Sequence, residues 1–180
     1  MRITGGSAKG QIIKTHQSAA VRPTTDKVRE AIFSILGALA NNWDRGLDLF
    51  AGSGALGIEA LSRGAAEVMF VEHEPLAVRV LRENLTRLKA EGGRVEQAEA
   101  LAWLRQPATP FEIVLLDPPF GAGLLEPVFA ALETGGWLKA TAWLYLETEA
   151  GWQSASLPAH WTLHREKTAG AVAYRLARRE

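Results

Sequence analysis

Short apolar runs alternate with amphipathic helical patterns along most of this sequence, and this alternation limits the possible folds more than any other feature. The alternating segments begin after Gly46 and cover residues 47–51, 55–62, 68–71, 76–88, 94–97, 101–104, 111–116, 124–132 and 143–147. Such an order is typical of a parallel sheet with helices on both faces. The unbroken apolar run Ile113-Val114-Leu115-Leu116 predicts a central strand covered on both sides. The predicted fold class is therefore α/β.

The end of the chain adds an antiparallel element to this sheet. Strand-like runs at residues 161–165 and 171–177 are joined through Thr168-Ala169-Gly170. A short connection that contains glycine favours a β-hairpin. We therefore expect a C-terminal antiparallel hairpin that closes one edge of the sheet.

The start of the chain predicts a small unit of its own. Arg2–Thr4 and Gln11–Thr15 can pair as a hairpin, because Gly5, Gly6 and Gly10 lie between them. Apolar residues at helical spacing then predict a helix from about Val28 to Leu39, with Thr24 or Thr25 as its N-cap. The expected division is an N-terminal hairpin appendage over residues 1–20 and one main domain over residues 21–180.

Length and composition exclude several classes of protein. A chain of 180 residues can bury about 70% of the surface that it exposes when unfolded, so it needs no disulfide or structural metal. It contains no cysteine, which excludes disulfide scaffolds, zinc fingers and thiol catalysis. Its first ten residues are polar and glycine-rich, unlike a secretory signal, and no apolar run reaches the roughly 18 residues of a membrane span. We expect a soluble, cytoplasmic protein without a membrane partner.

The charges are balanced in total but not along the chain. Lys and Arg number 20, as do Asp and Glu, and the net charge is zero. Residues 1–30 nevertheless have a net charge of +4 and residues 160–180 of +3, whereas the part between them has a net charge of −7. A balanced total therefore does not exclude an anionic partner that binds at the two ends.

A glycine-rich loop follows the first predicted strand and opens the next helix. Gly52, Gly54 and Gly57 have the spacing G-x-G-x-x-G, in which missing side chains permit a tight turn and close approach of a ligand to the backbone. Glu72 ends the following strand, twenty positions after Gly52, where an acid can accept both hydroxyls of a ribose. The predicted nucleotide-binding residues of this region are Asp48, Phe50, Ala51, Gly52, Ser53, Gly54, Gly57, Glu72 and His73.

Two kinds of ligand fit such a loop, a dinucleotide and S-adenosylmethionine. Asp48 stands four residues before the first glycine, inside the mouth of the loop. A carboxylate at this position repels a pyrophosphate but suits an ammonium and a sulfonium group. This acid favours the methyl donor, and an NAD(P)-dependent oxidoreductase remains the alternative of a different class.

The sequence Asp117-Pro118-Pro119-Phe120 follows the most apolar strand, where an open α/β sheet places its reacting groups. The Asp117 carboxylate and the Pro118 carbonyl can each accept one N–H of an exocyclic amine and direct its lone pair toward a methyl group. The two prolines add no competing backbone donors, and Phe120 can stack on a base. These four residues are the predicted catalytic residues.

Together these motifs resemble those of amino-directed, S-adenosylmethionine-dependent methyltransferases. The residues Arg22-Pro-Thr-Thr-Asp-Lys-Val-Arg-Glu-Ala31, Phe33-Ser34 and Asp48-Leu-Phe-Ala-Gly-Ser-Gly54 closely resemble one family among them. It consists of the bacterial enzymes that methylate the N2 amine of a guanine in 16S ribosomal RNA. The likeness runs from Arg2-Ile3 to Val172-Ala173-Tyr174-Arg175.

The resemblance implies a Rossmann-like methyltransferase sheet of seven strands and a monomer that acts on 16S RNA in the small ribosomal subunit. It places Arg22, Thr24 and Thr25 beside the methionine end of the donor, and Glu99 with Ala100 at the adenine. It implies RNA contact by cations near both ends of the chain, namely Arg2, Lys9, Lys14, Arg22, Arg29, Lys167 and Arg175. No metal is expected.

Other acceptors and roles stay open at this point. The same donor and the same four residues could serve an adenine or cytosine amine in DNA, or a glutamine amide in a protein. Asp117 in place of Asn, and the lack of a separate target-recognition domain, favour RNA. A module that keeps the fold and binds the donor without catalysis is a further possibility.

Overall fold

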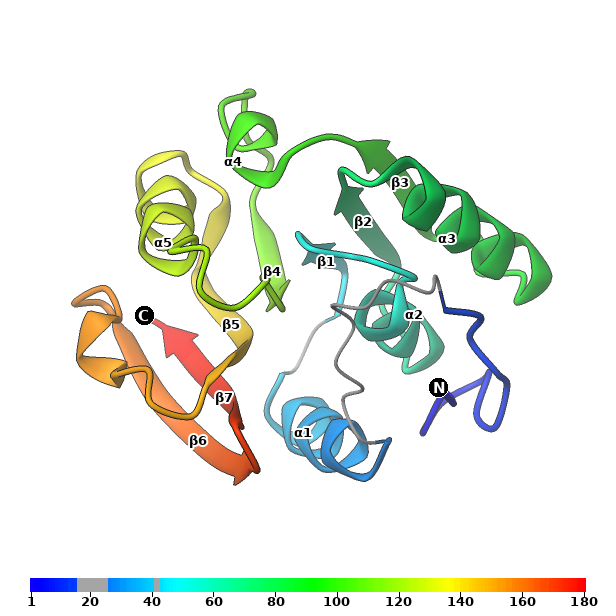
Figure 1. Cartoon of the computed structure of the whole chain (residues 1–180), viewed down its shortest axis with the longest axis horizontal. Helices are drawn as coiled ribbons and strands as arrows, with labels where there is room; N and C mark the ends of the chain where they lie inside the picture. Colours follow the sequence, from blue (N-terminus) through cyan, green and yellow to red (C-terminus); the bar gives the residue numbers. More distant parts are fainter. Residues whose placement is uncertain (16–25, 41–42) are drawn as a thin grey trace.

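The computed structural model describes residues 1–15, 26–40 and 43–180 as a twisted sheet between two layers of helices (Figure 1). Its elements are α1 (Asp26–Leu39), β1 (Arg45–Asp48), α2 (Ala55–Ser62), β2 (Glu67–Glu72), α3 (Pro75–Arg87), β3 (Gly93–Gln97), α4 (Ala100–Trp103), β4 (Phe111–Leu116), α5 (Leu125–Thr134), β5 (Leu138–Glu149), a short 3-10 helix (Ser154–Ser156), β6 (Trp161–Ala169) and β7 (Val172–Arg179). The predicted alternation of strands and helices is confirmed.

The seven strands form one sheet in the order β3-β2-β1-β4-β5-β7-β6. Strands β1 to β5 pair in parallel, whereas β7 pairs antiparallel with both β5 and β6. The C-terminal hairpin is thus confirmed, and β6 forms the edge of the sheet. Gly170 turns the chain between β6 and β7 with φ at 61°, a conformation that costs glycine little.

Alternate residues of each strand enter two apolar clusters, one on each face of the sheet. In β4, Ile113 and Leu115 join a cluster with α1, α2 and α3, whereas Val114 and Leu116 join a cluster with α4 and α5. All six residues of β4 are buried. The apolar run predicted to be a central strand is therefore covered by helices on both faces, as its composition requires.

The N-terminal segment packs onto this domain. Arg2 and Ile12 form an isolated antiparallel bridge, which confirms the predicted pairing in its smallest form. Ile3 and Ile13 are both 1% exposed and belong to the same cluster as α1 and α2. Residues 1–15 therefore share the core of the main domain, while the predicted boundary at residue 20 lies outside the described residues and stays a prediction.

Several strands differ in length from their predictions. β5 runs from Leu138 to Glu149, longer at both ends than the predicted 143–147, because Leu138 pairs with β4 and the last eight residues pair with β7. The same pairing extends β6 to Ala169 and β7 to Arg179, beyond the predicted ends at residues 165 and 177. β1 ends at Asp48, before the predicted Ala51, because the chain turns into the glycine loop there. No helix in the described part of the chain is both long and apolar enough to cross a membrane.

Candidate active site

The strand order reverses between β1 and β4, and the predicted site residues meet at this point. β1 is followed in space by β2 on one side and by β4 on the other, which makes their carboxyl ends the mouth of a crevice. Asp48 is the last residue of β1, Glu72 is the last of β2, and Asp117 directly follows β4. In the sheet register, Asp48 is aligned with Leu115, two residues before Asp117. The structure therefore brings these three carboxylates to one edge of the sheet.

The glycine loop closes tightly between β1 and α2. Gly52 and Gly54 have φ at 55° and 91°, and Gly54 is the N-cap of α2. A side chain at Gly54 would come within 2.3 Å of Leu81, and one at Gly57 within 2.2 Å of Phe70. The three glycines are thus needed for the turn and for close packing of α3 and β2 against the loop and α2.

Asp48 is buried and only half satisfied. It is 1% exposed, and its Oδ2 accepts a hydrogen bond of 2.9 Å from the Gly57 amide. Its Oδ1 is buried and has no hydrogen-bond partner among the described residues. Burial raises the pKa of Asp48 to about 7, the Gly57 amide opposes this shift, and the charges of Glu72 and Glu147 add to it. A cation beside Oδ1 would relieve this unfavourable state.

Glu72 holds the loop in place through backbone amides. Its Oε2 accepts from Gly52 at 2.7 Å, and its Oε1 accepts from His73 and Glu74 at 3.0 and 2.9 Å. His73 is largely exposed, and its Nδ1 lies 3.3 Å from Glu72 Oε1. A carboxylate oxygen has two lone pairs, so Oε2 can still accept from a ligand at the rim. The predicted contact of Glu72 with a ribose stays a prediction, as does that of His73 with an adenosine.

Glu99 follows β3 and caps α4. Its two oxygens accept from the Leu101 and Ala102 amides at 3.0 and 2.8 Å. The Leu101 amide is the main reason that the pKa of this exposed carboxyl is lowered. Ala100, the first residue of α4, is buried. The structure thus gives Glu99 a local structural role, and its predicted contact with the adenine stays a prediction.

The loop after β4 borders a pocket of about 480 Å³. Pro118 is buried, Pro119 is exposed and Phe120 is partly buried, and all three line the pocket. The opposite wall comes from the carboxyl end of β5 and the residues after it, including Glu147 and Trp152. The four predicted catalytic residues thus lie at the switch point, three of them at the wall of a cavity large enough for a base.

A buried pair on β5 was missed by the sequence analysis. The Tyr145 hydroxyl donates a hydrogen bond of 2.6 Å to Glu147 Oε1, and Glu147 is 2% exposed. Burial, followed by the charges of Glu147 and Asp117, raises the pKa of Tyr145 well above its usual value, so this hydroxyl remains a donor. The signal was a single acid in the apolar run Trp143-Leu144-Tyr145-Leu146-Glu147.

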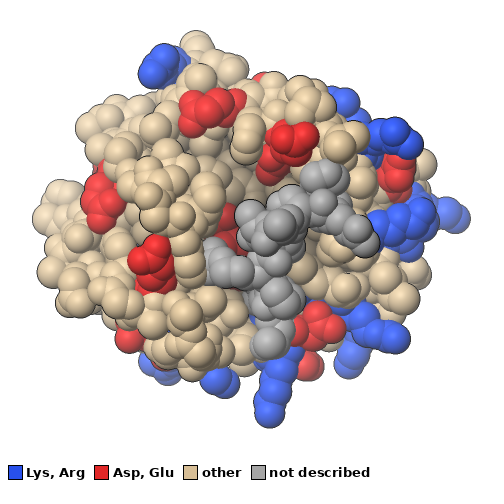
Figure 2. Space-filling model, viewed as in Figure 1, with Lys and Arg blue, Asp and Glu red and all other residues tan. Residues whose placement is uncertain are grey.

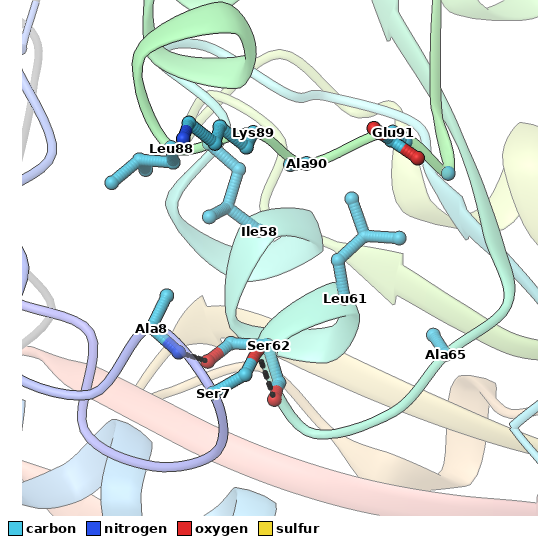
Figure 3. Close-up of a pocket in the computed structure, with 11 residues that line it drawn as sticks. Ser7, Ala8, Ile58, Leu61, Ser62, Ala65, Leu88, Lys89, Ala90 and Glu91 are labelled. Carbon is cyan, nitrogen blue, oxygen red and sulfur yellow. Dashed lines mark hydrogen bonds between the residues drawn. The ribbon is translucent and has the colours of Figure 1, made fainter.

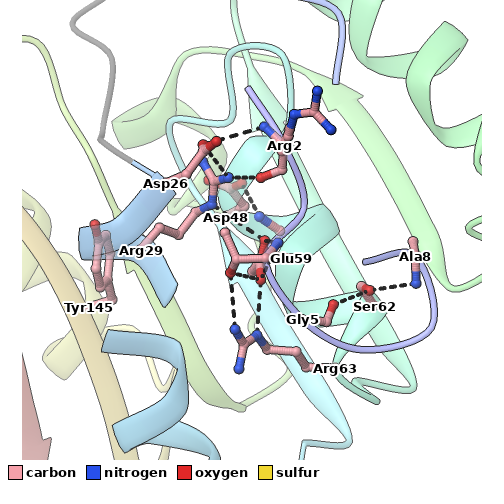
Figure 4. A network of polar contacts seen from close by, with 12 residues as sticks. Arg2, Gly5, Ala8, Asp26, Arg29, Asp48, Glu59, Ser62, Arg63 and Tyr145 are labelled. Atoms are coloured by element: carbon pink, nitrogen blue, oxygen red, sulfur yellow. Dashed lines mark hydrogen bonds and ion pairs between the residues drawn. The ribbon is translucent and has the colours of Figure 1, made fainter. Parts of the chain in front are cut away.

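The structure corrects two of the predicted RNA contacts. Arg29 is fully buried, donates to the Arg2 carbonyl oxygen, and lies 3.4 Å from Glu59 and 3.0 Å from Asp26 (Figure 4). Arg175 is 3% exposed and donates to Glu166, Thr148 and the Trp152 carbonyl oxygen. Neither guanidinium can reach a phosphate, because both are enclosed by acceptors inside the protein.

Each of the other predicted RNA contacts, and the predicted donor contacts near residue 22, either stays a prediction or lies outside the described residues. The side chains of Arg2, Lys9, Lys14 and Lys167 are exposed, so their contact with RNA stays a prediction. Arg22, Thr24 and Thr25 lie outside the described residues. In the described part of the chain, no three or more His, Asp or Glu residues form a group that could hold a metal ion.

The comparison by sequence and the comparison by structure both find proteins named as methyltransferases among those similar to this chain. The family model described as Conserved hypothetical protein 95 matches residues 1–178. The chain is 46% identical over 180 residues to a ribosomal RNA small subunit methyltransferase D of Escherichia coli, covering all of this chain and 90% of the relative. It is 40% identical to the protein of that name from Haemophilus influenzae, covering 98% of this chain and 92% of the relative.

Two of the solved structures that are similar to this one belong to proteins described as a putative methyltransferase or methylase. A putative methyltransferase from Escherichia coli superposes with a TM-score of 0.89 at 45% identity, covering all of this chain and 98% of that one. A putative methylase from Haemophilus influenzae superposes with a TM-score of 0.82 at 38% identity, covering 99% of this chain and 97% of that one. The chain therefore belongs to the Conserved hypothetical protein 95 family, to which it is matched over nearly its whole length.

Proposed function

We propose that this protein transfers a methyl group from S-adenosylmethionine to the N2 amine of a guanine in 16S ribosomal RNA. The relatives that are 40 to 46% identical over nearly the whole chain are named as methyltransferases of small-subunit ribosomal RNA. One structural observation carries the chemistry: Asp48 and Asp117 lie at the carboxyl ends of adjacent parallel strands, and the residues that directly follow Asp117 line a pocket of about 480 Å³. This arrangement supplies a donor site and an acceptor site next to each other.

The donor site suits a cationic ligand better than a dinucleotide. Asp48 Oδ1 is buried without a hydrogen-bond partner among the described residues, and Glu72 lies close enough to raise the pKa of Asp48 further. A pyrophosphate would add negative charge to this cluster, whereas the ammonium and sulfonium groups of S-adenosylmethionine would neutralise it. When bound, the donor supplies an electrophilic methyl group.

The acceptor site suits an exocyclic amine. An amine of this kind has two N–H groups, and the Asp117 carboxylate and the Pro118 carbonyl oxygen can each accept one of them. These two acceptors turn the nitrogen lone pair toward the methyl group and stabilise the positive charge that develops on nitrogen. As the N–C bond forms, the C–S bond of the donor breaks and S-adenosylhomocysteine is left, while the surplus proton of the nitrogen passes to Asp117 or to solvent. Phe120, at the pocket wall, is placed to stack on the ring of the base.

The proposed substrate also indicates where in the cell the protein acts. Small ribosomal subunits are assembled in the bacterial cytoplasm, so we expect the protein to work there. We expect it to act as a monomer, because one chain contains both the donor site and the acceptor site.

The affinity for S-adenosylmethionine is expected to fall as the pH is lowered through 7. The pKa of Asp48 is raised to about 7, so this carboxyl is increasingly protonated below that pH and must lose its proton to pair with a cation. Each pH unit below the pKa then lowers the affinity by up to about tenfold. Calorimetric titration between pH 6 and pH 8 measures this dependence. The Asp48→Asn variant should bind more weakly at pH 8 and show little dependence on pH; a slope equal to that of the wild type would contradict the role of Asp48.

The proposed methyl donor and the proposed acceptor are tested by giving the protein several candidate cofactors and several candidate substrates. Addition of S-adenosylmethionine should raise the melting temperature, whereas NAD(H) and NADP(H) should leave it unchanged. Labelled donor should then transfer methyl groups to small subunits that lack the modification, and not to DNA or to protein. Stabilisation by NAD(H) alone would favour an oxidoreductase, and donor binding without transfer to any RNA would favour a module without catalysis.

A further inference from the structure

The longest exposed helix beside the donor site has a cationic surface that the sequence analysis did not assign. The solvent side of α3 and the turn after it contains Arg79, Arg82, Arg87 and Lys89, all exposed. Only one acid, Glu83, lies among them, and it pairs with Arg79 at 3.2 Å. A helix surface on which cations outnumber acids fits an anionic partner.

The N-terminal segment lies against this helix and continues its charge. Asn84 on α3 accepts from the Lys14 amide at 3.0 Å and donates to the Lys14 carbonyl oxygen at 2.8 Å. Arg87 donates to the Ile12 carbonyl oxygen. Asn84 is fully buried, so this two-way clamp is a fixed part of the fold. Lys14 is therefore held beside α3, although seventy residues separate it from Asn84 in the sequence.

At the far end of α3, the N-terminal segment and the turn after the helix line the same pocket. Ser7 and Ala8 face the stretch Leu88–Glu91 across a pocket of about 150 Å³, with α2 as its floor (Figure 3). The Ala8 amide donates a hydrogen bond of 2.9 Å to the side chain of Ser62 on α2. Lys9, the next residue, is exposed on the same loop. The N-terminal segment thus adds the exposed Lys14 and Lys9 to the side of the molecule formed by α3 and the turn after it.

We name the joint surface the α3 face and define it by Lys9, Lys14, Arg79, Arg82, Arg87 and Lys89. Residues 1–15 and 75–90 together contain seven Lys or Arg and one Glu, in a chain whose net charge is zero. Lys and Arg gather on the right of Figure 2, where Figure 1 places α3 and the N-terminal segment. The concentration of charge is therefore a property of this side of the fold and not of the whole protein.

Lys89 occupies a position where lysine is structurally unfavourable. The Ala90 amide donates to the Leu85 carbonyl oxygen at 2.9 Å and the Lys89 amide to that of Thr86 at 3.1 Å, which is the hydrogen-bond pattern of a Schellman motif. Lys89 has φ at 53°, the left-handed conformation that glycine adopts at lower cost at this position. Among the described residues other than glycine, Lys89 alone has a positive φ. A strained residue that is cationic and exposed indicates a use for its charge.

Helix α3 packs against the glycine loop of the donor site through its buried side. The Asn84 side chain also donates a hydrogen bond of 3.0 Å to the carbonyl oxygen of Ser53 in the glycine loop. Leu81, on the buried side of α3, packs so close to Gly54 that a side chain there would meet it at 2.3 Å. A polyanion bound to the α3 face would therefore be separated from the glycine loop by this one helix.

We propose that the α3 face is an RNA-docking surface that binds the phosphate backbone flanking the target guanine. The inference rests on the proposed function, because the RNA is the one whose base enters the pocket beside Asp117. Phosphate contacts by lysine and arginine fix the position of a nucleic acid without reading its sequence. The α3 face would attract the RNA and hold it in position, and the pocket after β4 would select the base.

The test measures RNA binding separately from methyl transfer. Affinity for unmodified small subunits and for naked 16S RNA is titrated between about 50 and 200 mM salt for the wild type, Arg82→Gln and Lys89→Gly. Each variant should bind several-fold more weakly at low salt, and the slope of log affinity against log salt should become shallower by about 0.7 to 0.9 for each lost contact. Their affinity for S-adenosylmethionine should equal that of the wild type.

Two further variants make the test specific. Lys89→Gly should raise the melting temperature while it weakens RNA binding, whereas Lys89→Arg should retain RNA binding. Lys139→Gln removes an exposed cation near the amino end of β5, at the opposite end of the parallel strands from the donor site, and should bind RNA as the wild type does. Wild-type binding by Arg82→Gln and Lys89→Gly, or an equal loss in Lys139→Gln, would overturn the assignment. A melting temperature that does not rise in Lys89→Gly would contradict the strain at this position.

The outcome also separates this inference from the proposed function. If the α3 variants lose RNA affinity but the wild type methylates no guanine, the docking face stands and the proposed reaction fails. If the wild type methylates guanine and the α3 variants bind RNA normally, the reaction stands and the docking face fails.

Discussion

Replacement of Asp117 by alanine should lower the rate of methyl transfer by about 10²- to 10⁴-fold while donor binding changes little. Asp117 directly follows β4 and is partly exposed. Without its carboxylate, the amine loses one of its two acceptors and the positive charge that develops on nitrogen loses its nearest counter-charge. The rate should therefore fall through kcat, and the affinity for S-adenosylmethionine should remain near that of the wild type.

Single-turnover methylation and calorimetric titration of the donor measure the two quantities independently. Asp117→Asn is the matched control, because it keeps a carbonyl acceptor and loses the charge. It should retain part of the activity that Asp117→Ala loses. A loss of donor affinity in Asp117→Ala that equals the loss of rate would place this residue in the donor site and contradict its proposed role.

Replacement of Glu59 by alanine should lower the free energy of unfolding by about 3 to 5 kcal/mol. Glu59 on α2 is fully buried and lies at the centre of the network in Figure 4. It accepts from the Thr4 amide at 3.0 Å and from Arg63 at 3.0 Å, and it lies 3.4 Å from Arg29. Without it, Asp26, which is partly exposed, would be the one ion-pair partner that the fully buried Arg29 keeps among the described residues.

Urea denaturation of the wild type and two variants tests this prediction. The control is Glu83→Ala, which removes an exposed acid from the surface pair with Arg79 and should cost about 0.5 kcal/mol or less. The Glu59 variant should also be cleaved faster by protease near the N-terminus, because Glu59 binds Thr4. Equal losses of stability in the two variants would mean that the buried network contributes no more than a surface pair.

The sequence predicted the elements that rest on local patterns. The apolar run of β4, the glycine spacing before α2 and the glycine turn between β6 and β7 depend on neighbouring residues, so their positions could be inferred from the sequence alone. The predicted bounds of α2 and β4 agree with the structure, because each element has a clear start and end in its own composition. The length of β5 depends instead on its pairing with β7, which no local pattern reveals.

Arg29 illustrates what the sequence analysis could not resolve. It stands on the apolar stripe of α1 with Ile32, Phe33 and Leu36, a position that indicates burial. Its partner Glu59 lies thirty residues away on another helix, so the pattern could not reveal the ion pair that makes this burial possible. The RNA contacts predicted near the N-terminus therefore included one residue, Arg29, that is buried and stabilises the core.

For the carboxylates of the site, too, some features could be predicted from the sequence and others depend on the folded chain. The ends of β1, β2 and β4 could be predicted, and with them the positions of Asp48, Glu72 and Asp117. Their hydrogen bonds could not, because the amides that Glu72 binds belong to a loop and a helix start that only the folded chain brings together. The basic side of α3 was missed for a similar reason, since it becomes continuous only when the N-terminal segment packs beside it.

The central claim is that this protein methylates the exocyclic amine of guanine in small-subunit RNA. The most direct test is to incubate unmodified small subunits with labelled donor, digest the RNA and identify the product nucleoside, with Asp117→Ala as the negative control. We predict a single labelled product, N2-methylguanosine, that is absent with the variant. A label on the ring of guanine, on adenine or cytosine, or on a ribose would contradict the proposed geometry of Asp117 and Pro118.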